Sequence, residues 1–505
     1  MILPLCRIFR ACLMPGLMPA LVALALLTFA GSAWAADAAP VSAIAEQGFA
    51  ARDIGYVLVD LADGKTIADW QGDRLFVPGS VLKLVTSLTA WKILGEDFHF
   101  TTRLWQAGDA LYLQGSGDPV LTATDLQSLL RSLQATRPGL AWRHFYLDTG
   151  AILPAATISE RQPLAADYNP GFGALNVDFN RLAVTPSRAR SDGAWQVSSQ
   201  AYGLTVPIDW VPITPSPALL PLGAPFVPAA GDGDKPQDRW WYASDSLPAD
   251  KTAAGEMFLP VKQADPMTGK IFRVIAKSLG IALPEPQYGA VPADAVLLAQ
   301  HDSPALPGVL QGLLRYSNNL SAELIGITAA KRLTGQTGSL VAAASAQLRW
   351  LTANLPAVNW QGFRMVNHSG LDGDNRASPR QMAGLLQAIA ANPALADCLP
   401  DITASLAAGG AATEPAGLRI TGKSGTMDYA AGLAGLMTMP GHRQYAYVIF
   451  MADDRQRAAL DARFDARILR PAKDGRAWTL RARLLQASLL KAFVAEAEHY
   501  EAGLH

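Results

Sequence analysis

Apolar and polar positions near the start of the chain follow the patterns of a hairpin and a buried helix. Residues 54–70, IGYVLVDLADGKTIADW, place two runs rich in β-branched residues on either side of an Asp-Gly pair, which predicts two antiparallel strands. From Val81 to Leu94 nearly every position is apolar or small, and Gly95 follows. This pattern predicts a helix that is buried on most sides and ends at the glycine.

The middle of the chain, residues 98–257, has a different pattern of apolar residues. Short apolar runs alternate there with Gly and Pro, and residues 207–236 are too rich in proline for a packed helix. We expect a β-rich insertion in this region, with a smaller module nested near residues 180–250.

The second half of the chain returns to helical spacing and then to strands. Residues 418–439 and 443–454 predict consecutive antiparallel strands. An amphipathic helix is expected to end the chain and to lie on that sheet. A membrane-surface anchor would need a more basic polar face, so at most peripheral membrane contact is expected. Apolar residues recur at helical intervals in residues 269–280, 307–317, 321–333 and 477–499.

The N-terminus has the layout of a secretory signal peptide. Arg7 and Arg10 precede an apolar run over residues 17–31, no acidic residue occurs in this part, and the small-x-small sequence Ala33-Trp34-Ala35 follows. This layout predicts cleavage after Ala35 and export, with the periplasm as destination. No later stretch reaches the roughly 18 to 20 uninterrupted apolar residues of a membrane span.

These patterns divide the chain into three parts. A length of 505 residues exceeds one ordinary hydrophobic core, so more than one domain is expected. We expect a signal peptide over residues 1–35, a main domain formed by residues 36–97 and 258–505, and the β-rich insertion over residues 98–257 between its two segments.

Composition excludes several classes of function. With 42 Lys and Arg against 43 Asp and Glu, the chain has no excess of positive charge to attract nucleic acid. Cys6 and Cys12 lie in the predicted leader, so Cys398 alone remains and can form no intrachain disulfide. The seven histidines lack the spacing of metal ligands, so neither a metal nor another cofactor is expected.

The start of the buried helix carries the first candidate for chemistry, Ser80-x-x-Lys83. Residues three apart share one helix face, so the lysine amine can reach the serine hydroxyl. Burial lowers the pKa of a lysine, which leaves the amine able to accept the serine's proton. Alone, the pair is as easily the polar start of a helix, because such short motifs occur by chance.

Two further polar motifs follow in the chain. Ser317-Asn318-Asn319 lies between predicted helices, where it can aim a hydroxyl and an amide into a cleft or simply cap a helix. On a predicted strand, Lys423-Ser424-Gly425-Thr426 offers a lysine and hydroxyls for a substrate carboxylate, and its glycine permits close backbone approach.

The order of these motifs, on a helix, a loop and a strand, is that of penicillin-recognising serine enzymes. The chain resembles the D-Ala-D-Ala carboxypeptidase/endopeptidase family of low-molecular-mass (class C) penicillin-binding proteins, in which a long insertion separates the first two motifs. Nearly all of the chain after the leader takes part in the resemblance. The stretches that carry it are LTAWKILGEDFHFTT (88–102), GSGDPVL (115–121), ALNVDFN (174–180), SNNLSAEL (317–324) and HSGLDGDNRASP (368–379).

The resemblance implies an α/β (α+β) fold of the penicillin-binding and β-lactamase-like type. Its antiparallel sheet is flanked by helices, accompanied by a helical subdomain and carries β-rich inserted domains. The implied activity is hydrolysis of D-Ala-D-Ala bonds in peptidoglycan stem peptides through an acyl-enzyme, with β-lactams acylating the same serine. Whether carboxypeptidase or DD-endopeptidase action dominates, which diamino acid is recognised and whether the chain oligomerises stay open.

The resemblance also assigns roles to the motif residues. Ser80 would be the nucleophile and Lys83 its proton acceptor. Ser317 and Asn319 would line the opposite wall, with Ser317 relaying a proton to the leaving D-alanine. Lys423 and Ser424 would bind the terminal carboxylate, and the N–H groups of Ser80 and Thr426 would form the oxyanion hole beside Gly425.

The sequence departs from the family pattern at three places. Ser424 stands where threonine is commoner, Asn318 stands where aspartate is more usual, and residues 399–417 lack an expected Asp-Gly-Thr-Leu run. The first change keeps the hydroxyl. The third concerns the loop that precedes the strand motif.

Three alternatives accompany this interpretation. Tyr316-Ser317-Asn318 also fits the Tyr-x-Asn frame of class C β-lactamases and related esterases, with Tyr316 assisting proton transfer. Residues 417–424, GLRITGKS, fit a nucleotide-binding P-loop, but the expected strand after them is the wrong context, so no nucleotide is expected. A non-catalytic peptidoglycan-binding relative is the third alternative.

Overall fold

The computed structural model describes most of the chain after its N-terminal segment. The described residues are 47–137, 139, 141–186, 195–200, 203–217, 220, 226–229, 238–242, 257–404, 416–467 and 473–504. The predicted signal peptide, residues 1–35, lies outside the described residues, as does most of the segment before the strand motif.

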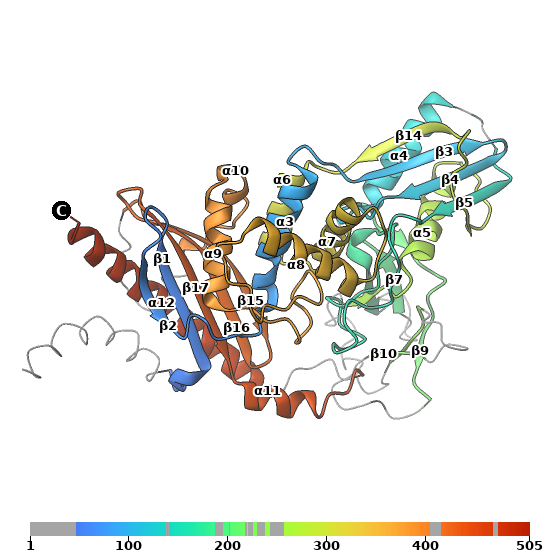
Figure 1. Cartoon of the computed structure of the whole chain (residues 1–505). Coiled ribbons are helices and arrows are strands. Elements are labelled where there is room, and N and C mark those ends of the chain that lie inside the picture. Colours follow the sequence, from blue (N-terminus) through green and yellow to red (C-terminus); the bar gives the residue numbers. More distant parts are fainter. Residues whose placement is uncertain are drawn as a thin grey trace, which may run out of the picture.

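A five-stranded antiparallel sheet of order β15-β16-β17-β1-β2 forms the centre of the main domain (Figure 1). The predicted hairpin is β1 (Ile54–Asp60) and β2 (Thr66–Trp70). The predicted C-terminal strands are β15 (Arg419–Met427), β16 (Ala430–Thr438) and β17 (Gln444–Ala452). β17 pairs with β1, so strands from the two sequence segments of the main domain meet in one sheet.

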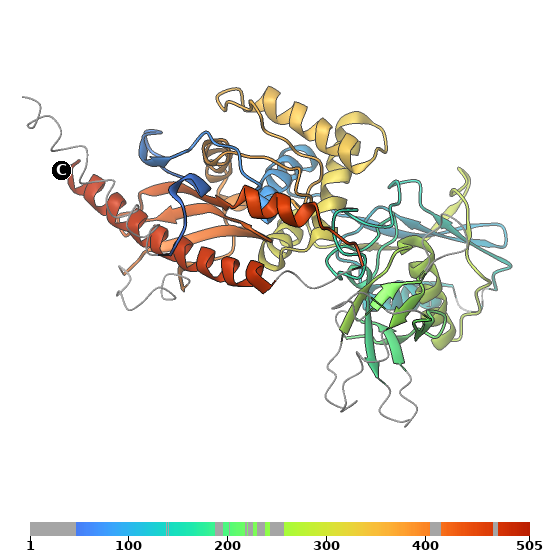
Figure 2. The same cartoon turned by 90° about the horizontal axis from the view of Figure 1, so that it is seen from below.

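Helices cover both faces of this sheet, which explains why β17 is apolar along nearly its whole length. α12 (Lys473–Ala502) packs on one face through Trp478, Leu489 and Phe493, as the sequence predicted for the terminal helix. On the other face lie α9 (Pro379–Ala390) and the buried helix α3 (Lys83–Leu94), so the sheet is the middle layer of three (Figure 2).

A helical region adjoins α3 and carries the second motif. It consists of α6 (Leu306–Tyr316), α7 (Asn319–Thr334), α8 (Leu340–Asn354) and the short α10 (Pro393–Ala396). α7 packs between α3 and α8, and most of its side chains are buried because both neighbouring helices cover them. The remaining short elements are η1 (Ala51–Asp53), η2 (Gly79–Leu82), η3 (Asp178–Asn180) and α11 (Asp454–Asp461).

The insertion is built on a separate five-stranded sheet of order β13-β5-β4-β3-β14. Helices α4 (Ala123–Thr136) and α5 (Ala264–Ser278) share its core, and α4 begins with a capping box between Thr122 and Asp125. The strands are β3 (Thr101–Ala107), β4 (Ala110–Gly115), β5 (His144–Asp148), β13 (Gln287–Tyr288) and β14 (Val296–Asp302).

Two small sheets complete the insertion. One has the order β12-β6-β7-β8 and the other β10-β11-β9. We propose that they are the nested module expected near residues 180–250. Their strands are β6 (Arg181–Pro186), β7 (Trp195–Ser199), β8 (Val206–Pro207), β9 (Ile213–Pro215), β10 (Phe226–Pro228), β11 (Trp240–Tyr242) and β12 (Met257–Pro260).

The sheet topology does not follow the expected domain boundary at residue 257. β14 pairs with β3 and β13 pairs with β5, so the chain completes the sheet of the insertion before it returns to the main domain. We propose that the return lies after Asp302. Helical periodicity in residues 269–280 correctly indicates α5, but periodicity says nothing about which core a helix joins.

Across the described residues, no helix combines the length and the apolar character that crossing a bilayer requires.

The packing of α12 yields a test of what holds the main domain together. Leu489→Ala, at a fully buried position, should lower the free energy of unfolding by about 2–5 kcal/mol, because it leaves a cavity between helix and sheet. Leu480→Ala on the same helix, where the side chain is 62% exposed, should change it by less than about 0.5 kcal/mol. Urea denaturation followed by circular dichroism measures both values, and equal losses would contradict the assignment of the buried face.

Candidate active site

Ser80 lies in the tight turn that opens helix α3. Residues Gly79–Leu82 form the 3-10 turn η2, and Lys83 is the first residue of α3, two positions later than the sequence pattern indicated. The short spacing brings the Lys83 amine, Nζ, to 2.8 Å from Ser80 Oγ. The two residues of the first motif are therefore in hydrogen-bond contact.

Lys83 is fully buried and has two other oxygen partners. Nζ lies 2.8 Å from Asn319 Oδ1 and 2.9 Å from the backbone oxygen of Ser369. Burial, and after it the charge of Lys423, holds the pKa of Lys83 well below that of a free lysine, while Glu323 acts in the opposite direction. The amine can thus lose its proton where an exposed lysine would keep it.

The second motif forms the junction between α6 and α7. Ser317 has a left-handed backbone, with φ 57° and ψ 31°, a conformation that a residue other than glycine rarely adopts without a functional or structural cause. Asn318 caps α7 by accepting a hydrogen bond from the N–H of Ser321, and Asn319 begins the helix. Besides contacting Lys83, Asn319 donates through Nδ2 to the oxygen of Tyr168, so it also holds a loop of the insertion.

The third motif alternates along strand β15. Lys423 and Gly425 are buried, whereas Ser424 and Thr426 are exposed on the opposite face. Lys423 donates from Nζ to the backbone oxygen of Ser424 at 2.7 Å, and burial lowers its pKa to about 8. Thr426 lines the same cleft as Ser80.

Gly425 places β15 directly against the turn that holds Ser80. A Cβ added at this position would lie 2.6 Å from the Pro78 oxygen and 2.7 Å from Ser80 N. From the other side, a Cβ on Gly79 would lie 3.4 Å from Thr426 N. The two backbone segments therefore touch without an intervening side chain, which brings the N–H groups of Ser80 and Thr426 into one neighbourhood.

A loop that the sequence analysis left without a role completes the surroundings of Lys83. Ser369 supplies an oxygen to Lys83, and Gly370, with φ +78°, packs so closely that a Cβ there would lie 1.8 Å from the Gly79 oxygen. The fully buried Glu323 on α7 accepts the backbone N–H groups of His368 and Ser369. The matching stretch 368–379 pointed to this loop, but not to a backbone acceptor within it.

A cleft of about 690 Å³ lies beside these residues, and Lys83, Lys423, Ser424 and Gly425 are not among the residues that line it. Ser80, Ser317, Asn319 and Thr426 line one part of it. Another part is rich in arginines, with fewer aspartates to balance them. The cleft-lining charged residues are Arg161, Arg457, Arg463, Arg476, Arg483, Asp428, Asp461 and Asp465.

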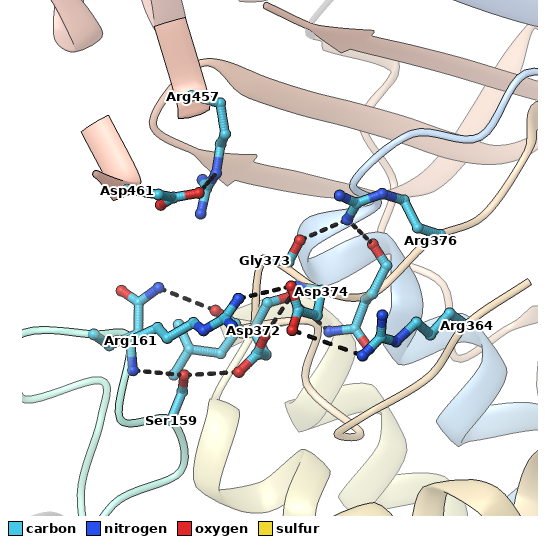
Figure 3. Close-up of polar contacts among 12 residues, drawn as sticks. Ser159, Arg161, Arg364, Asp372, Gly373, Asp374, Arg376, Arg457 and Asp461 are labelled. Atoms are coloured by element: carbon cyan, nitrogen blue, oxygen red, sulfur yellow. Dashed lines mark hydrogen bonds and ion pairs between the residues drawn. The ribbon is translucent and has the colours of Figure 1, made fainter. Parts of the chain in front are cut away.

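The insertion contributes one wall of the cleft, and polar contacts fasten it to the loop after Ser369 (Figure 3). Ser159 donates to Asp372, and Arg161 pairs with Asp374 at 2.7 Å. Across the cleft, Arg457 of α11 lies near Asp461, and its guanidinium occupies the space beside Gly373, where a Cβ would lie 2.7 Å from Nη2.

The structure also bears on the alternatives to the serine motif. The Tyr316 side chain is 70% exposed and does not line the cleft, whereas Ser317 does, so the Tyr-x-Asn frame is disfavoured. Residues 419–427 form one continuous strand that turns back into β16, while a P-loop requires a strand followed by a helix. The described residues contain no group of three or more side chains suited to holding a metal ion.

Comparison with known proteins agrees with this geometry. Residues 38–187 and 242–468 match the D-Ala-D-Ala carboxypeptidase 3 (S13) family. The chain belongs to this family. It is a family of serine-type hydrolases, and its match spans both the main domain and most of the insertion.

Two similar proteins come from different bacteria. The chain is 28% identical to a D-alanyl-D-alanine carboxypeptidase of Actinomadura sp. (strain R39), over 54% of this chain and about half, 53%, of that relative. It is 25% identical to the D-alanyl-D-alanine carboxypeptidase DacB of Haemophilus influenzae, over 79% of this chain and 85% of the relative.

The fold expected from the resemblance is confirmed by a solved structure. Penicillin-binding protein 4 of Haemophilus influenzae aligns with a TM-score of 0.66 and 21% identity, covering 87% of this chain and 96% of that one. The fold is thus the penicillin-binding, β-lactamase-like type with its inserted sheets.

The contact between Gly425 and the nucleophile turn gives a testable prediction. Gly425→Ala should lower the free energy of unfolding by about 1–3 kcal/mol, because backbone atoms must move to admit a methyl group. Gly312→Ala in α6, with nothing within 4 Å of the added carbon, should leave it unchanged or raise it by up to about 1 kcal/mol. Thermal and urea unfolding measure both changes; a neutral Gly425→Ala would show that β15 and the turn are not in tight contact.

Proposed function

We propose that this protein is a serine D-Ala-D-Ala carboxypeptidase that removes the terminal D-alanine from peptidoglycan stem peptides and is acylated by β-lactams at Ser80. The observation that carries the proposal is the contact of buried Lys83 with both Ser80 Oγ and Asn319 Oδ1. A helix cap requires neither a buried amine nor a partner 236 positions away. Membership of the family supports the same activity.

Acylation would begin with transfer of the Ser80 proton to Lys83. The deprotonated Oγ then attacks the carbonyl carbon of the D-Ala-D-Ala bond and forms a tetrahedral intermediate. The N–H groups of Ser80 and Thr426 would bind its oxyanion, and donors of this kind contribute about 3–4 kcal/mol each to transition-state stabilisation.

Collapse of the intermediate requires a proton on the departing amine. Ser317 lines the same cleft as Ser80 and would relay the proton from Lys83 to the leaving D-alanine, while Asn319, bonded to Lys83, would orient the lysine. Water then attacks the acyl-enzyme and releases the shortened peptide, again with the lysine as proton acceptor.

Substrate binding would rest on positive charge. Lys423 and the hydroxyl of Ser424 would hold the terminal carboxylate, while Gly425, expected from the sequence to bind substrate, instead lets β15 lie against the turn of Ser80. The arginines farther along the cleft suit the other carboxylates of an acidic stem peptide. Lys423 and Ser424 would also bind the carboxylate of a β-lactam.

Export to the periplasm is part of the proposal. It rests on the leader-like composition of residues 1–35 and on the location of peptidoglycan outside the cytoplasmic membrane. Nucleic acid and nucleotide are not proposed as partners.

Mass spectrometry of the intact protein after incubation with a penicillin tests the assignment of the nucleophile. We expect one adduct that peptide mapping places on Ser80, because its hydroxyl contacts the buried amine. Ser80→Ala should lose the adduct and reduce D-alanine release by about a thousandfold or more.

Tyr316→Phe is the matched control and should keep both activities, since the phenol is exposed. An adduct elsewhere than Ser80, or a dead Tyr316→Phe beside an active Ser317→Ala, would overturn the assignment.

The pH dependence of peptide hydrolysis tests the role of Lys423. Its pKa is lowered to about 8, so its charge is present below that pH and is lost above it. We expect kcat/KM for a D-Ala-D-Ala peptide to fall above about pH 8 as carboxylate binding weakens. The same peptide with a C-terminal amide should be a poor substrate without this fall, and persistence of the fall with the amide would rule out Lys423 as its cause.

A further inference from the structure

Glu323 is a buried acid behind the catalytic lysine. It lies on α7, four residues after Asn319, and its side chain is fully buried. Oε2 accepts the N–H of His368 at 2.8 Å, and Oε1 accepts the N–H of Ser369 at 3.0 Å. A buried carboxyl is costly unless it is bonded in this way, so its presence here calls for a function.

The peptide that Glu323 holds is the one that contacts Lys83. The Ser369 oxygen accepts from Lys83 Nζ at 2.9 Å, while the Ser369 N–H is bonded to Glu323. Thr86 of α3 donates to the oxygen of His368 at 2.7 Å and fixes the same loop from the other side. The carboxyl thus sets the position of one of the oxygens around the lysine.

That oxygen decides where the lone pair of a neutral Lys83 points. A neutral amine has two N–H groups and one lone pair, whereas Asn319 Oδ1 and the Ser369 oxygen can only accept hydrogen bonds. Together they take both N–H groups, which leaves the lone pair for the hydroxyl of Ser80. Helix α7 determines the position of both acceptors: it carries Asn319, and its Glu323 binds the N–H of Ser369.

The loop has little room to move away from this position. The His368 ring is fully buried against Gly326 of α7, where an added Cβ would lie 2.1 Å from the ring. Gly370 is in equally close contact with the Gly79 oxygen. Loss of the carboxyl would therefore leave buried N–H groups without their acceptor rather than let the loop swing outward.

The charges around Glu323 give its role an observable signature. The charge of Lys83 on α3 lowers the pKa of Glu323, and the charge of Lys423 on β15 lowers that of Lys83. Burial lowers the pKa of His368 to about 3, so that the ring is neutral. Burial raises the pKa of Glu323 to about 7, and its negative form favours the protonated form of Lys83. Replacing it by a neutral group should therefore lower the pKa of Lys83.

We propose that Glu323 is a positioning residue for the acylation reaction: it holds the Ser369 carbonyl against Lys83, so that the lysine lone pair faces Ser80. The inference rests on the proposed function, because it assigns Glu323 a part in acylation of Ser80. It acts through Lys83 and does not itself contact the substrate.

Acylation of the full-length protein by a fluorescent penicillin, measured across pH, tests the proposal. Glu323→Gln keeps the shape but can accept only one of the two N–H groups. We expect its second-order acylation rate at pH 7 to fall roughly ten- to a hundredfold, a loss on the scale of impaired general-base catalysis. The acidic limb of its pH profile should also move to lower pH, because Lys83 loses a neighbouring negative charge.

Gln347→Leu is the matched control. Gln347 of α8 is also fully buried, and it bonds the oxygen of Gly326 and the hydroxyl of Thr89 without contacting Lys83. Its substitution should lower the melting temperature and leave the acidic limb at its wild-type position. If Glu323→Gln behaves in the same way, or keeps the wild-type rate and limb, the positioning role is wrong.

Glu323→Asp decides the matter if Glu323→Gln does not fold. It keeps the charge but withdraws the carboxyl by one methylene, so the rate should fall while the acidic limb stays nearer its wild-type position; an undiminished rate would overturn the proposal. Failure of the proposed function is separately visible, since the wild-type protein would then show no penicillin adduct on Ser80.

Discussion

The amine of Lys83 is surrounded by oxygen atoms from three separate parts of the chain, and the cleft is organised around that contact. Ser80 belongs to the turn before α3, Asn319 begins α7, and Ser369 lies in the loop before α9. A charged amine in such a place is penalised by burial, and a neutral one needs its hydrogen atoms and lone pair directed. The hydrogen bonds that this one nitrogen requires fix the positions of the helical region, the turn of Ser80 and the loop relative to one another.

The surrounding fold makes the segments around Lys83 more rigid than the outer edge of the cleft. α3 is buried between the sheet and the helical region, so the turn of Ser80 is attached to one of the least exposed helices of the described chain. The insertion also contacts this region, because the backbone oxygen of Tyr168 accepts a hydrogen bond from Nδ2 of Asn319. A domain inserted far away in sequence thereby becomes a wall of the cleft.

Much of the main domain could be predicted from local pattern. The hairpin 54–70, the strands around Lys423 and the terminal helix follow from alternation and helical spacing, which depend on neighbouring residues. The three motifs could be named because their side chains are of types suited to the proposed chemistry. Ser369 contributes a backbone oxygen, which every residue possesses, so the residue type at this position does not reveal the contact. The pairing of β14 with β3, on which our proposal of a later domain boundary rests, is a long-range contact that local pattern does not reveal.

Two glycines, Gly370 and Gly425, bring bare backbone against the turn of Ser80 from two sides. A methyl group at Gly370 would overlap the Gly79 oxygen, and one at Gly425 would press on the Pro78 oxygen and the Ser80 nitrogen. A side chain gained at either position would therefore displace the same turn. Changes in substrate preference within this lineage should accordingly accumulate in the outer, arginine-bearing part of the cleft, where side chains can be exchanged one at a time.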